Sequence, residues 1–412
     1  MTEGKQEEAG RRASASGRVA GIIFAAGGLL LFAYYVWKAG PQSIWLNITR
    51  LGAGFVVVLA ISAVRPLVRA VAWTRCFEGG ARLRVSDALK AYLAGDALGS
   101  LTPLGMVVSE PAKAAFVRDR VPVVASISAL AVENLFYMLS VALFIFAGTA
   151  ALLLSFPLPR ELRIVSYATL GVVVVVILVG YLMVRRQWRF LSGALEALYA
   201  RGVARRFFET RRERIRAVED RIYGFYSHHQ SRFLPILALE ACFHLAGVAE
   251  VYATLYLMNV RPTWLAAFVL ESVNRVINVV FKFVPMRAGV DEFGTGKFTK
   301  LLKVGTEDIG VTLAIIRKAR VIFWTAVGVA VLVRRGLSVR SMAREAREAA
   351  ALAASEAGQE RVPRASASAA ATTTTTTTTT TTGEARGDGN VGNVSNSGGD
   401  GVVNKEGLIV PR

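Results

Sequence analysis

Two stretches of this chain place a helix-breaking turn and a carboxylate inside sequence that is otherwise apolar. Each has a proline, a glycine and then, seven residues after the proline, a glutamate: Pro103, Gly105 and Glu110; Pro285, Gly289 and Glu292. A charge at the centre of a bilayer costs about 2.5–3.5 kcal/mol on insertion scales, so it usually faces a partner or water. Backbone freed by a broken helix is tolerated at that depth only inside protein or beside a water-filled space. We therefore expect both carboxylates to bind a charged group or a proton.

Other ionisable residues in the apolar segments are spaced to pair on one helix face. Lys113 lies three residues after the first of these glutamates. Glu271 and Arg275 have the i,i+4 spacing at which helix side chains meet, and Glu240 and His244 share it. Such pairs either neutralise each other and fix helix packing, or they take part in function. For the two i,i+4 pairs both interpretations stay open.

Arg65 and Arg69 interrupt another apolar segment, residues 52–73. Both lie toward its inner half, and a long arginine side chain can cover apolar surface while its charged head stays in the headgroup layer. We expect these two side chains to extend to the headgroups.

The sequence carries no recognisable catalytic or metal-binding motif. It lacks a nucleophile elbow, a P-loop and a dinucleotide-binding fingerprint. His228 and His229 have no carboxylate or cysteine at ligand spacing, and Cys242 with His244 makes no metal motif on its own. We therefore expect no cofactor and no metal. The chain has only two cysteines, which does not indicate a disulfide framework.

The elements that must position these residues are membrane helices. Hydrophobic residues make up 53% of the 412, and the mean hydropathy is +0.43. Several windows reach the ~20 apolar residues that cross a bilayer. We predict an all-α polytopic membrane protein with about six full spans, at residues 19–37, 52–73, 121–150, 162–184, 233–258 and 311–333. Two segments that contain the broken stretches are predicted to be re-entrant hairpins, residues 87–118 and 261–303.

Basic residues set the orientation of these spans. The formal charge is +19, and twelve arginines fall between positions 185 and 232, with more after position 333. Basic loops mark the cytoplasmic side of a membrane protein and attract anionic headgroups, which explains most of this charge without nucleic acid. The two hairpins must then enter from opposite sides. This predicts inverted repeats in a multi-pass protein of the cell (plasma or inner) membrane, with both termini cytoplasmic.

The chain divides into three predicted regions. Residues 1–18 form a cytoplasmic arm, and residues 19–335 form the membrane domain. Within that domain, residues 184–231 are either a basic amphipathic segment in the headgroup layer or a solvated linker. Residues 336–412 include eleven consecutive threonines from Thr372 to Thr382 and are predicted to be a disordered, low-complexity cytoplasmic tail.

Three segments resemble a known membrane family. "TPLGMVVSEPAKAAFVRDRVPVVASISALAVENLF" is similar to the first signature of the lysylphosphatidylglycerol synthase transmembrane (flippase-like) family, and "ESVNRVINVVFKFVPMRAGVDEF" is similar to the second. "IIRKARVIFW" resembles the basic cluster that opens the last span, particularly in the hopanoid-biosynthesis-associated branch. The resemblance covers about residues 20–335. The soluble aminoacyl-transferase domain of some relatives is not expected here.

The resemblance also implies which residues of this chain have a functional role. It implies a role for Glu110, Arg118, Glu133, Glu292 and Arg320, and the expected substrate-binding set adds Lys113 and Arg317. The chain departs from the family at three places: Ser109 replaces a frequent glycine, Asn134 a usual arginine, and Arg287–Ala288 a usual Gly-Gly pair. We expect the second turn to be less tight as a result.

Together these observations favour a protein that translocates or binds polar or anionic lipids through broken helices around a charged intramembrane cavity. Its expected partners are membrane lipids, with a further copy of the chain or a lipid-synthesis protein as candidates. Two alternatives stay open. One is a membrane enzyme or accessory subunit in isoprenoid, hopanoid or lipid-linked sugar metabolism, with Glu110 and Glu133 as an acid–base pair. The other is a scaffold that recruits partners through its basic loop.

Overall fold

The computed structural model describes residues 30–78, 80–101, 105–186, 230–281, 284, 287–336, 344, 345 and 348. The chain divides into two compact units, residues 1–361 and 362–412, and all described residues belong to the first. Their regular elements are α-helices, which confirms the prediction of an all-α polytopic membrane protein. Several predictions concern positions outside the described residues: Pro103, Pro285, the arm 1–18, most of the segment 184–231 and nearly all of the tail 336–412.

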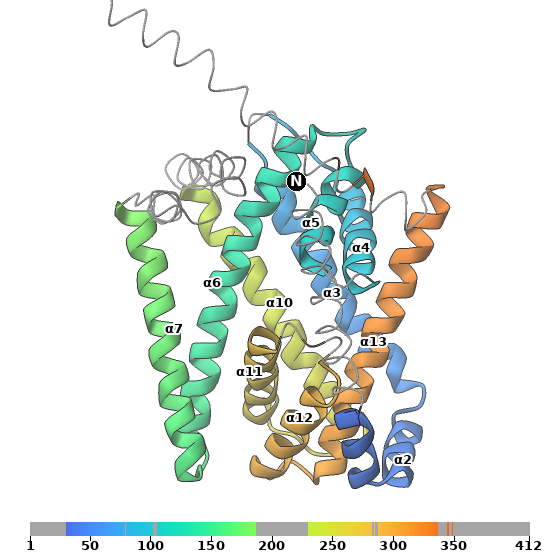
Figure 1. Cartoon of the computed structure of the whole chain (residues 1–412), viewed down its shortest axis with the longest axis vertical. Coiled ribbons are helices and arrows are strands. Elements are labelled where there is room, and N and C mark those ends of the chain that lie inside the picture. The colour runs from blue at the N-terminus through green and yellow to red at the C-terminus, as the bar shows by residue number, and fades with distance from the viewer. Residues whose placement is uncertain are drawn as a thin grey trace, which may run out of the picture. The chain divides into compact units, whose positions relative to one another are not determined.

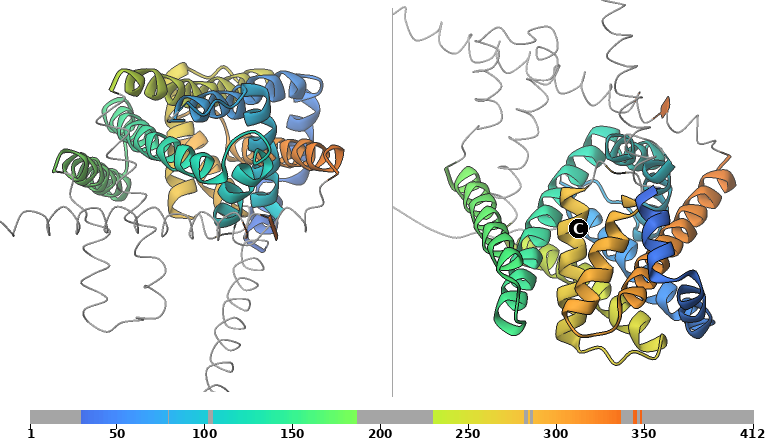
Figure 2. Two further views of the ribbon diagram at one scale, coloured as in Figure 1. Left: turned by 90° about the horizontal axis from the view of Figure 1, so that it is seen from above. Right: turned by 60° about the horizontal axis from the view of Figure 1, so that its bottom comes forward.

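Four of the described helices are long and apolar enough to cross a membrane: α3 (Gly54–Arg75), α6 (Val123–Ser155), α7 (Arg160–Arg186) and α10 (Gln230–Leu257). They coincide with four of the six expected spans, and the count of six stays a prediction. Of the first expected span, residues 30–37 are described, and they are helical. α7 packs beside α6 at the edge of the helices in Figures 1 and 2, and it exposes a row of valines and leucines.

Two helical hairpins stand between the long helices. The first consists of α4 (Val85–Leu101) and α5 (Gly105–Phe116), and the second of α11 (Trp264–Val280) and α12 (Val290–Leu301). Their helices have the same lengths, 17 and 12 residues in each hairpin. At 1.5 Å per residue, 12 residues span about 18 Å, which is short of the ~30 Å hydrocarbon core.

The helix order repeats, and so does the packing. A long helix, a hairpin and a long helix occur as α3–α4–α5–α6 and again as α10–α11–α12–α13, where α13 is Glu307–Arg334. α3 packs on α10, its counterpart. α4 packs on α13 in the same way that α11 packs on α6. Such reciprocal contacts are typical of two internal repeats related by a pseudo-two-fold axis.

The two hairpins open toward opposite ends of this unit. The end of α3 lies beside the start of α10. Arg232 there donates hydrogen bonds to the carbonyl oxygens of Arg75 (3.4 Å) and Phe77 (3.0 Å). At this end, uppermost in Figure 1, Arg335 after α13 binds Asp119 after α5 (2.8 Å). At the lower end Lys297 of α12 binds Glu307, the first residue of α13 (2.8 Å). We call these the upper and lower ends.

Buried apolar side chains form two cores with polar residues between them. The upper core includes Trp73, Tyr92 and Leu130, and the lower core includes Leu255 and Leu270. On α3 the lower core ends at Val58 and the upper core begins at Ala70, with two arginines between them. On α13 Arg317, Lys318 and Arg320 follow Ile316 of the lower core. The ionisable side chains are thus placed between two apolar layers.

Candidate functional site

Six charged side chains from four helices meet between the two cores. We call them the central arginine cluster: Arg65 (α3), Glu250 (α10), Glu271 and Arg275 (α11), and Arg317 and Arg320 (α13).

Glu271 is the hub of the central arginine cluster. Its carboxylate accepts hydrogen bonds from Nη2 of Arg275 (2.7 Å), Nη2 of Arg317 (3.0 Å) and Nη2 of Arg65 (3.3 Å). Glycine at position 247 of α10 makes room for it, because an added Cβ there would lie 2.6 Å from Glu271 Oε1. The i,i+4 pair of Glu271 and Arg275 therefore forms, but as part of a larger network.

Glu250 is the second carboxylate of the cluster. It accepts a hydrogen bond from Nη1 of Arg65 (3.3 Å) and another from Arg320. The ring of Phe243 lies under two of the guanidinium groups, 4.7 Å from that of Arg65 and 5.1 Å from that of Arg275. An aromatic face attracts a cation by its quadrupole, so this ring helps to hold charges that the two carboxylates do not neutralise.

The central arginine cluster has more positive charge than negative charge. Four guanidinium groups face two carboxylates, a difference of 4 − 2 = +2. The Arg275 and Arg317 side chains are only 8% and 10% exposed. Nε of Arg275 and Nη1 of Arg317 are buried and have no hydrogen-bond partner among the described residues. Buried cations with free N–H groups are costly unless an anion joins them, so the arrangement is suited to binding an anion.

One turn along α3, Arg69 forms a second ion pair. Its Nε and Nη2 bind the two carboxylate oxygens of Glu133 at 2.6 and 2.7 Å, and Nη2 also binds Oδ1 of Asn134 at 3.0 Å. The guanidinium lies 4.0 Å from the centre of the Tyr137 ring. The expectation that Arg65 and Arg69 extend to the headgroups is wrong, because acidic partners on neighbouring helices hold both inside the protein.

Glu240 and His244 do not bind each other. Both carboxylate oxygens of Glu240 and Nδ1 of His244 are buried without a hydrogen-bond partner. Nε2 of His244 instead lies 3.1 Å from Oγ of Ser140, and its ring stacks on Phe144 with centroids 4.5 Å apart. The possibility that the two residues neutralise each other is therefore wrong.

At each hairpin a lysine lies between two carboxylates. At the first, Nζ of Lys113 lies 2.9 Å from Asp96 and 3.0 Å from Glu110. At the second, Nζ of Lys318 lies 2.6 Å from Glu292 and 3.5 Å from Asp291. Glu110 and Glu292 thus each bind a lysine, although Lys113 belongs to the hairpin itself and Lys318 to α13.

Two described residues of the second turn have a left-handed backbone conformation. Arg287 and Gly289 both have φ in the left-handed region, +47° and +80°. The Gly289 backbone N–H donates to Oε2 of Glu292 at 2.7 Å, which caps α12. Only glycine adopts this region routinely, so Arg287 is held there by its surroundings, including its contact with Asp291 (3.2 Å). The expectation of a less tight second turn stays a prediction, because Pro285 lies outside the described residues.

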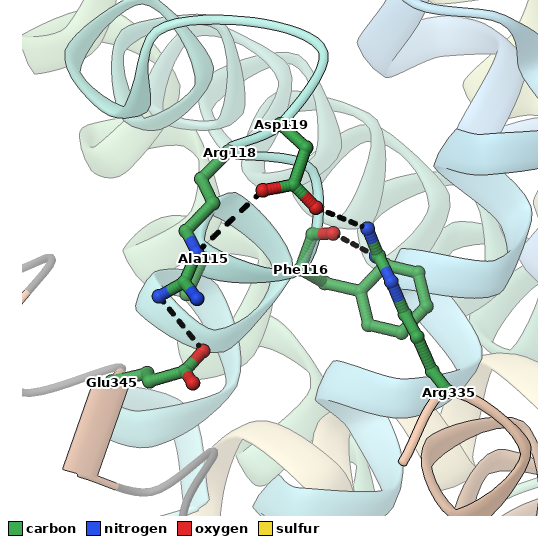
Figure 3. Close-up of a pocket in the computed structure, with 6 residues that line it drawn as sticks. All are labelled: Ala115, Phe116, Arg118, Asp119, Arg335 and Glu345. Carbon is green, nitrogen blue, oxygen red and sulfur yellow. Dashed lines mark hydrogen bonds and ion pairs between the residues drawn. The ribbon is translucent and has the colours of Figure 1, made fainter. Parts of the chain in front are cut away.

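Arg118 lies apart from these groups, in the loop after α5. Figure 3 shows it beside a cavity of about 150 Å³ that is lined by Phe116, Asp119, Arg335 and Glu345. Its Nη1 binds Glu345 at 3.1 Å, and its side chain is 51% exposed. Arg118 is therefore a residue of the upper end.

The structure distributes the expected substrate-binding residues among separate groups. Arg317 and Arg320 belong to the central arginine cluster, and Glu133 is the partner of Arg69. Glu110 with Lys113, and Glu292, lie at the two hairpins. Sequence reasoning missed the roles of Arg65 and Arg69 and of three acidic or basic partners: Asp96, Glu250 and Lys318. The signal that could have found them was the position of both arginines well inside an apolar segment.

A family model described as the lysylphosphatidylglycerol synthase TM region matches residues 18–328. The chain belongs to this family. The match includes every residue of the central arginine cluster and of the two hairpins, so the lysylphosphatidylglycerol synthase transmembrane region contains all the interior charged groups described above. Membership supports a membrane protein in a lipid-related process. No curated protein and no solved structure matches the chain.

Proposed function

We propose that this protein binds an anionic lipid headgroup in its central arginine cluster and moves it between the two leaflets. The observation that carries the proposal is the excess of four guanidinium groups over two carboxylates on buried side chains. A phosphate supplies the missing negative charge, and guanidinium N–H groups match its oxygens in geometry. The free N–H groups of Arg275 and Arg317 are the donors that it would use.

The surroundings of the cluster favour a lipid over a soluble anion. The cluster lies between two apolar cores, and α7 and the other long helices expose valine and leucine side chains outward. A lipid can place its headgroup among the arginines while its acyl chains stay in the bilayer. Membership in a lipid-related membrane family supports the same interpretation.

The two hairpins offer routes from the two sides. The first opens at the upper end and the second at the lower end, and at each hairpin a lysine is bound to carboxylates. An arriving phosphate competes with those carboxylates for the lysine. We therefore assign Lys113 and Lys318 to the path of the headgroup toward the central arginine cluster.

Reconstituted vesicles test the proposal. Purified protein is inserted into vesicles that contain fluorescently labelled phosphatidylglycerol or phosphatidylcholine, and the label in the outer leaflet is quenched chemically. We expect the protein to speed the exchange of the anionic lipid between leaflets, and to act less on the zwitterionic lipid. Exchange of both lipids no faster than in empty vesicles would overturn the proposal.

A pair of variants links the movement to the cluster. Arg317→Gln removes one of the excess cations and a free N–H donor, and we expect exchange of phosphatidylglycerol to fall at least tenfold. Arg261→Gln removes an equal charge from an exposed position between α10 and α11 and should leave exchange unchanged. Equal rates in the two variants would show that the cluster does not bind the headgroup.

The membrane-enzyme alternative depended on Glu110 and Glu133 acting together. In the structure each is bound to a different cation, Lys113 and Arg69 respectively. No contact between them is present among the described residues, so the geometry does not favour that acid–base pair.

A further inference from the structure

Glu240 is the most isolated acid in the described part of the protein. It lies on α10 and is fully buried, and neither of its carboxylate oxygens has a hydrogen-bond donor. An ionised carboxylate in such a place would lose its hydration with nothing in exchange, which is far more costly than burying a neutral acid. Glu240 is therefore protonated.

The neighbour of the Glu240 carboxyl group is a second carboxyl group. Glu133 of α6 lies beside Glu240 where α6 packs on α10, and both of its oxygens are bound to Arg69. Two acids and one cation cannot all be ionised without leaving a bare negative charge. Arg69 is already bound by both oxygens of Glu133, so Glu240 has no cation of its own and carries the proton.

Among the described residues, the other charged and titratable groups around the two acids do not supply a second cation. From α3, Arg69 and the thiol of Cys76 face them, and from α6 the hydroxyl of Tyr137 does. Tyr92 of α4 lies beside Arg69, and His244 follows one turn along α10. The next guanidinium, on Arg65, is already bound to Glu250 and Glu271.

The geometry points to Glu133 and Glu240 as a proton-binding site in the membrane interior. Proton release breaks the O–H bond of Glu240, leaves two carboxylates beside Arg69, and passes the proton to water. That state is unstable while the helices stay closed, and it becomes accessible when α10 moves away from α6. The site thus holds a proton in the closed arrangement and exchanges it when the helices separate.

This site would couple a proton to lipid movement, and that part of the inference rests on the proposed function. α3 and α10 carry residues of both the proton site and the central arginine cluster, through Arg69 with Glu240 and Arg65 with Glu250. A headgroup that displaces α10 at the cluster would also move it away from α6 and open the acid pair. Protonation of Glu240 would then be required for the helices to close again.

Infrared spectroscopy tests the proton site without any lipid transport. A buried protonated carboxylic acid has a C=O stretching band that is distinct from that of a carboxylate, and we expect wild-type protein at neutral pH to show it. Glu240→Gln should remove this band, while Glu110→Gln should keep it, because Glu110 is bound to Lys113. Glu133→Gln should also remove it, since Glu240 then becomes the only counter-ion of Arg69. A band that persists in Glu240→Gln would overturn the site.

The vesicle assay at several pH values tests the coupling. We expect exchange of labelled phosphatidylglycerol by wild-type protein to change at least severalfold with pH, and Glu240→Gln to abolish that dependence. An equal pH dependence in Glu240→Gln and wild type would overturn the coupling while the infrared result still decides the site. If wild-type protein moves no lipid at any pH, the proposed function and the coupling fail, and the proton site is judged by its infrared band alone.

Discussion

Arg65 and Arg69 lie one turn apart on the same helix, but the groups around them have opposite imbalances of charge. Around Arg65, four guanidinium groups share two carboxylates, and two N–H donors have no partner. Around Arg69, one guanidinium faces two carboxyl groups, and both oxygens of Glu240 have no donor. One group lacks an anion and the other contains an acid that must keep its proton.

This difference shows why a buried ion pair alone says little about function. A balanced pair can serve only to fix the packing of two helices. An unbalanced group instead indicates what completes it: an anion beside Arg275 and Arg317, and a proton on Glu240. Because both groups use α3 and α10, a movement of these helices affects both.

The largest expected effect comes from the hub of the central arginine cluster. Glu271→Gln leaves four guanidinium groups with one carboxylate, and we expect a loss of about 3–5 kcal/mol in the free energy of unfolding, as when one partner of a buried pair is removed. Thermal unfolding in detergent measures it. Glu161→Gln, near the start of α7 on an exposed position, is the matched control. A midpoint equal to that of the control would show that the arginines need no anion.

Glu133→Gln should have a smaller effect than Glu271→Gln. Arg69 loses its bidentate partner, but Glu240 is within reach and can ionise to replace it. We expect about 1–3 kcal/mol of destabilisation, mainly from lost charged hydrogen bonds. The double variant Glu133→Gln/Glu240→Gln should lose more unfolding free energy than the two single variants lose together, because it leaves Arg69 without a carboxylate partner. Additive losses would contradict a shared site.

Glu240→Gln should barely change stability. Glutamine has the shape of the protonated acid and is likewise uncharged, so we expect a change within about 0.5 kcal/mol. Thermal unfolding at neutral pH is sufficient to measure it. A large stabilisation would mean that Glu240 is ionised in the wild-type protein, and the contrast between the two groups would then disappear.

The ion pair of Lys297 and Glu307 at the lower end is solvent-exposed, in contrast to the two interior charged groups. The hydrogen bond from Lys297 lowers the pKa of Glu307, which lies before the expected span 311–333. A lowered pKa in the folded state stabilises the fold at pH above the unfolded value of about 4.5, and this contribution is lost as pH falls through the folded value. The pair is solvent-exposed, so we expect at most about 1 kcal/mol. Unfolding of Lys297→Gln and wild type from pH 7 to pH 3 should converge at the acidic end, and a constant difference would contradict this.

The sequence was sufficient to predict the class of fold and the hairpins. Apolar length located α3, α6, α7 and α10, and the two proline–glycine–glutamate stretches marked the breaks between α4 and α5 and between α11 and α12. Charge bias required hairpins of opposite orientation. These features are local or depend on composition, so they can be read without knowing which helices touch.

The partners of the interior charges could not be predicted in the same way. Arg65 binds residues 185 and 206 positions away, and those contacts depend on how α3 packs against α10 and α11. Reasoning along one helix favoured Glu240 with His244, whereas the packing of α10 on α6 brings His244 to Ser140 instead. The i,i+4 pair of Glu271 and Arg275 was visible in the sequence, but not the two further arginines that bind the same carboxylate.

The central claim is that the excess guanidinium groups bind an anionic headgroup, and equilibrium binding measures it most directly. Short-chain phosphatidylglycerol is titrated into the full-length protein in a neutral detergent, with wild type compared with Arg275→Gln/Arg317→Gln and with Arg261→Gln. A hydrogen bond to a charged group contributes about 1.5–3 kcal/mol, so we predict at least tenfold weaker binding for the double variant alone. Equal affinity of all three proteins for phosphatidylglycerol would contradict the assignment of the central arginine cluster as the headgroup site.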